Sequence, residues 1–89
     1  MSEPAAELKL RDEELAVRTA RKDGRQVVSL RSIARAGGDF VVECEVYPVS
    51  GLRVEPLTPG PYAFATSHEV SYFIDEALEA LTYLGCEVS

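Results

Sequence analysis

The sequence predicts an α+β fold: an antiparallel β-meander of four strands, or five, with one C-terminal amphipathic helix packed on one face. Two observations predict it. Apolar and polar residues alternate repeatedly over residues 7–55, which is the period of strands with one buried face. Residues 67–84 instead repeat apolar side chains every three or four positions, which is the period of a helix. Short connections favour antiparallel neighbours, and one helix across such a sheet makes a two-layer domain.

The length of 89 residues fits a single domain with a small core. Residues 1–6 have no periodicity and are expected to be a frayed terminus. The first strand is expected where Ala6, Leu8 and Leu10 alternate with charged residues, and Asp12-Glu13 then fits a tight turn.

The second strand is expected where Leu15, Val17 and Thr19 alternate with their neighbours, ahead of Asp23-Gly24. Asp-Gly between two alternating runs favours a type I′ hairpin turn, because both central positions need a positive φ. A helix over residues 12–22 is the alternative, since this segment is rich in good helix formers. In the next strand, within residues 26–36, Ile33 breaks the alternation. That break indicates either a bulge near Ser32 or an exposed Ile33.

Residues 36–39, Ala-Gly-Gly-Asp, fit a second hairpin turn before the clearest alternation in the chain. Its expected core side is Phe40, Val42, Cys44 and Val46. Residues 48–51 end that strand, residues 52–55 suffice for a short fifth strand, and the Pro-rich residues 56–65 form a stiff connection. We expect a ring of Tyr62 or Phe64 to fill the gap between sheet and helix.

Several signals agree on the helix. Thr66 or Ser67 supplies a capping oxygen, and Glu69 completes a capping box. Gly85 suits the left-handed position after the last turn, which leaves residues 85–89 as a tail. The apolar stripe expected to face the sheet is Val70, Phe73, Ile74, Ala77, Leu78, Leu81 and Leu84.

Composition excludes several classes of function. The net charge of −6 disfavours nucleic acid and anionic membranes on average. The N-terminus lacks the basic and apolar regions of a signal peptide, and no apolar run is long enough to span a bilayer. We therefore expect a cytoplasmic protein with reduced thiols and no membrane partner. No cofactor is expected, because no zinc spacing, P-loop or dinucleotide fingerprint occurs.

Three side chains are candidates for chemistry, and each has a simpler interpretation. His68 is expected to be exposed in the first helical turn, without an orienting partner. Cys44 is expected in the core as a small apolar side chain. Cys86, just past the helix, lies near the negative end of the helix dipole, which disfavours a thiolate.

Charge is divided unevenly along the chain. Residues 1–38 carry a net charge of +2 and residues 39–89 a net charge of −8. The segment 15–38 is locally basic, and the helix has an acidic outer side. These two sets form the expected interaction surface: Arg18, Arg21, Lys22, Arg25, Arg31, Arg35, Asp75, Glu76 and Glu79.

The basic hairpin has two interpretations. It meets acidic groups of protein, either Glu43 and Glu45 on the next strand or the helix of a second copy, or it follows the phosphates of a nucleic acid. Residues 1–39 contain no aromatic residue for stacking on bases, which disfavours the second interpretation.

We therefore expect a non-enzymatic protein-interaction or self-associating module, whose partner is another protein or itself as a homo-oligomer such as a dimer. Exposed Tyr47, Tyr72 and Tyr83 would suit an interface. A nucleic-acid-binding regulator is the first alternative, and a small enzyme using His68 or Cys44 is the second.

Overall fold

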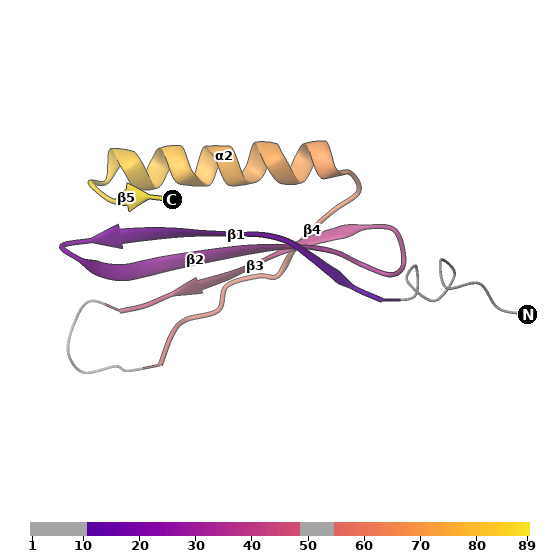
Figure 1. Ribbon diagram of the computed structural model, residues 1–89, viewed down its shortest axis with the longest axis horizontal. Coiled ribbons are helices and arrows are strands. Elements are labelled where there is room, and N and C mark those ends of the chain that lie inside the picture. Colours follow the sequence, from indigo (N-terminus) through magenta and orange to yellow (C-terminus); the bar gives the residue numbers. More distant parts are fainter. Residues whose placement is uncertain (1–10, 49–54) are drawn as a thin grey trace, which may run out of the picture.

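The computed structural model describes residues 11–48 and 55–89. Five strands form one antiparallel sheet in the order β4-β3-β2-β1-β5, and α2 lies along one face of it (Figure 1). The predicted α+β fold with a C-terminal helix is confirmed. The elements are β1 (Glu13–Lys22), β2 (Arg25–Ala34), β3 (Phe40–Val46), β4 (Tyr62–Phe64), α2 (Ser67–Tyr83) and β5 (Glu87–Val88).

The first strand of the described sheet starts later than the sequence predicts. The strand expected at residues 6–10 and most of the one expected at residues 52–55 lie outside the described residues. The tight turn predicted at Asp12-Glu13 is wrong, because Glu13 already begins β1 and Asp12 accepts a hydrogen bond from the Ala36 amide at 2.9 Å. The alternative helix over residues 12–22 is wrong as well, because this segment pairs with β2.

The predicted hairpin between β1 and β2 is confirmed. Asp23 and Gly24 adopt φ angles of 53° and 77°, the left-handed pair that a type I′ turn requires. The bulge expected near Ser32 lies in the opposite strand: β2 pairs regularly with β3 there, while Leu15 is the extra residue of β1 between Glu14 and Ala16. Ile33 is half-buried.

Two short strands appear where the sequence predicts none. β4 forms inside the Pro-rich connection and pairs with Phe40–Val42 of β3. β5 forms inside the expected tail and pairs with Ala20 and Arg21 of β1. Both elements are too short to show an alternating pattern. They are strands because the neighbouring strand offers unpaired main-chain groups.

The helix begins as predicted, with Thr66 accepting from the Glu69 amide and the Glu69 carboxylate accepting from the Thr66 amide. Gly85 has the expected positive φ of 92°. The prediction that Leu84 belongs to the buried stripe is wrong. Leu84 caps the helix and is 66% exposed, since the chain turns there toward β5.

The core lies between α2 and the central strands. Its buried residues are Leu30, Val42, Val70, Ile74 and Leu78. The centroid of the Phe73 ring lies 5.2 Å from the ring centroids of both Tyr62 and Phe64. The prediction that an aromatic ring of this segment fills the gap between sheet and helix is therefore confirmed. Partly buried side chains complete the core, among them Phe40 and Cys44 as predicted.

Candidate interaction surface

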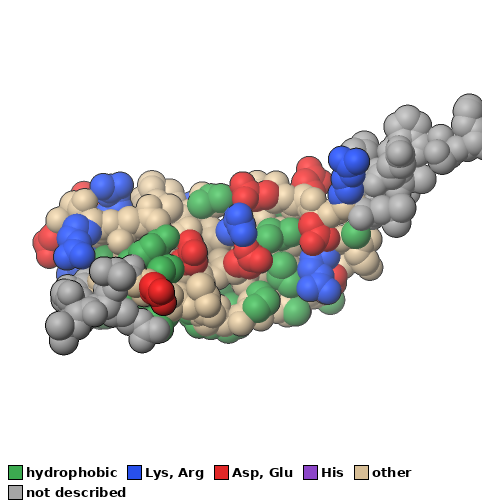
Figure 2. Space-filling view, turned by 90° about the horizontal axis from the view of Figure 1, so that it is seen from below, with side chains coloured by type: hydrophobic (Ala, Val, Ile, Leu, Met, Phe, Trp, Pro, Cys, Tyr) green, Lys and Arg blue, Asp and Glu red, His purple; other side chains and the backbone are tan. Residues whose placement is uncertain are grey.

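The side of the sheet opposite α2 carries no helix of the described chain (Figure 1). Side chains alternate along each strand, so the residues between those of the core point to this side. Figure 2 shows hydrophobic, acidic and basic side chains interspersed on it. We call it the open face, and its central residues are Glu14, Val17, Val27, Ser29, Arg31, Ile33, Val41, Glu43 and Glu45.

The open face is apolar in part. Val17 is 48% exposed, and Ile33 is half-buried. Val41 is only 6% exposed, because Ile33 and Ala63 flank it on the neighbouring strands. A sheet side with this much apolar surface differs from an ordinary solvated face, on which polar residues dominate.

Arg31 lies at the centre of the open face and joins three strands. Its Nε donates to Glu43 Oε1 at 3.0 Å, its Nη2 donates to the same oxygen, and its Nη1 lies 3.5 Å from Glu14 Oε1. The hydrogen bond to Glu43, with the charge of that carboxylate, raises the pKa of Arg31. The cross-strand ion pair expected between the basic hairpin and Glu43 is therefore present.

Glu45, the next residue of β3 on this face, is bound differently. It accepts a hydrogen bond from the Tyr47 hydroxyl at 3.1 Å. This bond, then burial and the charge of Glu45, raise the pKa of Tyr47. Within the described residues no cation pairs with Glu45, so its carboxylate keeps acceptor sites for another group.

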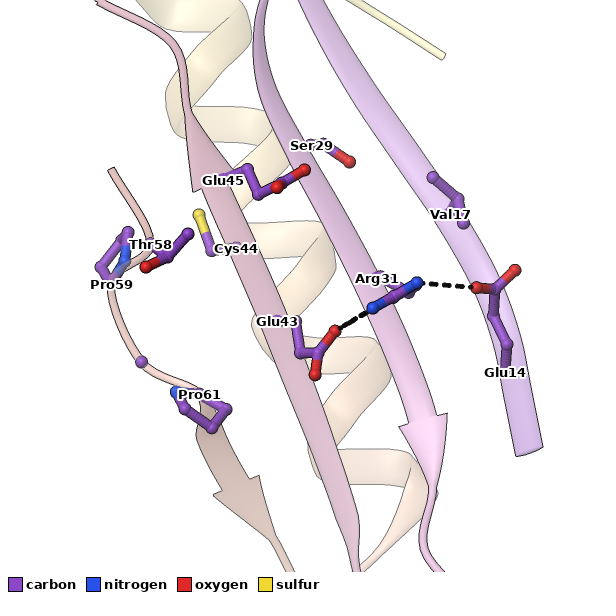
Figure 3. Close-up of a pocket in the computed structure, with 11 residues that line it drawn as sticks. Glu14, Val17, Ser29, Arg31, Glu43, Cys44, Glu45, Thr58, Pro59 and Pro61 are labelled. Carbon is purple, nitrogen blue, oxygen red and sulfur yellow. Dashed lines mark hydrogen bonds and ion pairs between the residues drawn. The ribbon is translucent and has the colours of Figure 1, made fainter. Parts of the chain in front are cut away.

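A groove of about 520 Å³ runs along this part of the open face. Glu43 and Glu45 form its floor on β3, and the segment from Thr58 to Pro61 stands beside that strand as a wall (Figure 3). Gly60 in this wall has a φ of 90°, and a Cβ there would come within 3.0 Å of the Tyr62 ring. The wall is therefore shaped by a residue without a side chain.

The basic residues singled out from the sequence are not gathered into one patch. Arg31 lies at the centre of the open face, while Arg35 pairs with Asp39 beyond the end of β2. At the other end, Arg21 donates to the Gly24 carbonyl, and Lys22 donates to the Leu84 carbonyl. Arg18 donates to the Ser89 carbonyl, and Arg25 follows the β1–β2 turn.

The acidic residues Asp75, Glu76 and Glu79 are exposed on the outer side of α2. No ion pair joins them to a cation of the described chain. Tyr72 and Tyr83 are 66% and 92% exposed on the helix, as expected, but Tyr47 is half-buried. A second, shallower depression of about 540 Å³ lies at the start of α2, lined by Phe64, His68, Glu69, Tyr72, Phe73 and Glu76.

None of the three candidate side chains forms a side-chain hydrogen bond to an acidic or basic group among the described residues. His68 makes no hydrogen bond within residues 11–48 and 55–89, and Cys44 and Cys86 are free. Burial, followed by the charge of Glu45, raises the pKa of the Cys44 thiol. In the same residues no three potential ligands meet around a metal position, and α2 lacks the length and apolarity that a membrane crossing requires.

The sequence did not single out the open face, because its residues come from three strands and become neighbours only through the register. The alternation of Glu43 and Glu45 with core residues was the available signal. Comparison of the chain with family models, curated proteins and solved structures found no match.

Proposed function

We propose that this chain is a non-enzymatic interaction module that associates with a second copy of itself through the open face. The observation that supports the proposal is the half-exposed apolar surface around Val17 and Ile33 on a sheet side that no described helix covers. Apolar surface bordered by charged groups is a common feature of protein–protein contacts.

The edges of the sheet fit this role less well. β4 has three residues and β5 has two, so neither offers a long template for another strand. The outer edge of β1 is interrupted by the extra residue Leu15 and carries the charged residues Glu13 and Glu14. Irregular, charged and short edges oppose strand addition, which leaves the face as the surface for contact.

The charges of the open face also suit a protein partner better than a nucleic acid. Arg31 is already paired with two carboxylates, and Glu45 adds a third negative charge beside it. Phosphates would be repelled by these groups. The cytoplasmic setting that we propose agrees with the two free cysteines.

Sedimentation velocity and light scattering from about 1 μM to about 1 mM protein test self-association, because this range covers weak and moderate dimers. We expect the mass to rise with concentration toward that of a dimer. Val17→Asp places a charge on the open face and should shift the protein to the monomer. A chain that stays monomeric throughout would contradict the proposal.

Leu84→Asp is the matched control, because Leu84 is another exposed aliphatic side chain but lies at the end of the helix. It should leave the association unchanged. Circular dichroism of both variants checks that the fold is kept. Equal loss of association in the two variants would show that contact does not depend on the open face.

A further inference from the structure

The open face carries charges of both signs at separate positions. Its acidic groove holds Glu45, whose described partner is the neutral hydroxyl of Tyr47. Its basic end holds Arg21, since strand alternation from Val17 through Thr19 places Arg21 on the same side of β1. Arg21 is exposed and lies opposite Glu87 in the β1–β5 pair, but within the described residues no ion pair joins the two, and Arg21 donates to the main-chain carbonyl of Gly24.

The register fixes how far apart these two groups lie. Glu45 is opposite Ser29, Ser29 is opposite Thr19, and Arg21 lies two residues further along β1, where the register shifts and Val27 is the extra residue of β2. Two strand spacings and two residues correspond to about 12 Å between the Cα atoms. The midpoint lies over β2 close to Val27, a half-buried apolar residue.

We propose that two copies of this chain pack open face to open face about a two-fold axis near Val27, with Arg21 of each protomer paired with Glu45 of the partner subunit. The inference depends on the proposed self-association and adds the contact that directs it. In a two-fold interface every contact occurs twice, so one cation and one anion on the same face suffice to make two ion pairs.

The axis near Val27 brings the two Val27 side chains together at the centre of the proposed interface, where an interface is most apolar, and places one charged pair on either side of them. Complementary charges at such positions mainly select the orientation and the partner, rather than supplying most of the affinity.

Charge reversal tests this pairing. Arg21→Glu places two acidic groups together in a homodimer, and Glu45→Arg places two basic groups together. Each variant alone should have a dissociation constant at least about tenfold higher than the unchanged protein in sedimentation velocity. Mixed in equal amounts, the two variants should associate again, because both contacts of the mixed dimer then join opposite charges.

Glu79→Arg is the control, since it reverses an exposed carboxylate on the outer side of α2, away from the open face. It should leave the dissociation constant unchanged, and urea unfolding of all variants checks that they are folded. If the wild-type protein dimerises but the mixture of Arg21→Glu and Glu45→Arg stays monomeric, the proposed pairing is wrong and the proposed self-association is still supported. An unchanged protein that is monomeric at every concentration would overturn both.

Discussion

The two faces of the sheet are built from the same strands but have opposite chemistry. Under α2, β2 and β3 present Leu30 and Val42, both nearly inaccessible to water. One residue further along, the open face presents Arg31 and Glu43, paired with each other and about half exposed. The helix covers the first face, whereas the second combines apolar surface with charged groups that still have acceptor or donor sites for hydrogen bonds. α2 therefore closes one side of the sheet, whereas no helix of the described residues covers the other.

The largest effect should come from truncating the covered face. Leu30→Ala removes a side chain that is 3% exposed and leaves a cavity beneath α2, so the free energy of unfolding should fall by about 2–5 kcal/mol. Ile33→Ala, three residues along the same strand but on the open face, should cost roughly 1 kcal/mol in the monomer. Urea unfolding at a concentration where the protein is monomeric measures both, and equal losses would contradict the difference between the faces.

A smaller effect should follow from loosening the helix that creates this difference. Thr66→Ala removes the hydroxyl that accepts from the Glu69 amide, and the loss of such a cap costs about 1 kcal/mol. Thr82→Ala in the same helix removes only a hydroxyl that donates to the Leu78 carbonyl, a bond within the helix, and should change stability less. Urea unfolding measures both losses. If Thr66→Ala cost no more stability than Thr82→Ala, the capping box would not stabilise the start of α2.

The sequence predicted the covered face far better than the open one. Val42 and its neighbours alternate strictly, and the helix has a cap and a stripe, so local patterns suffice for both layers. β4 and β5 were not predicted, because they are too short to show an alternating pattern and form only by pairing with the edges of β3 and β1. The positions of Arg21 and Glu45 depend on the strand register and on the irregularities in β1 and β2, which are properties of pairing and not of composition.

Cys44 offers a chemical probe of burial, because it packs against the core and also lines the groove beside Thr58 (Figure 3). Burial, with Glu45 beside it, raises the pKa of this thiol, so less thiolate is present at neutral pH. In a Cys86→Ser background, the pH midpoint of iodoacetamide labelling should be higher for the native protein than in urea, and the native rate at pH 7 should be lower. Glu45→Gln should lower the native midpoint only in part, because its charge is the smaller cause. Identical midpoints in native and unfolded protein would mean that Cys44 is not buried against the core.

The smallest effect should come from Tyr47, whose hydroxyl donates to Glu45 across the rim of the open face. Because the folded state raises the pKa of this phenol, folded protein holds the proton more tightly than unfolded protein does. The stability from this bond is therefore fully present below the ordinary tyrosine pKa of about 10 and is lost as the pH rises through the raised value. Carbon-13 resonances of the labelled Tyr47 ring should give a midpoint that falls toward the ordinary value in Glu45→Gln. In the proposed dimer Arg21 of the partner subunit brings a positive charge close to Glu45 and Tyr47, which favours the phenolate and should lower that midpoint as protein concentration rises. A midpoint independent of concentration in a protein that dimerises would show that Arg21 of the partner subunit does not reach Glu45.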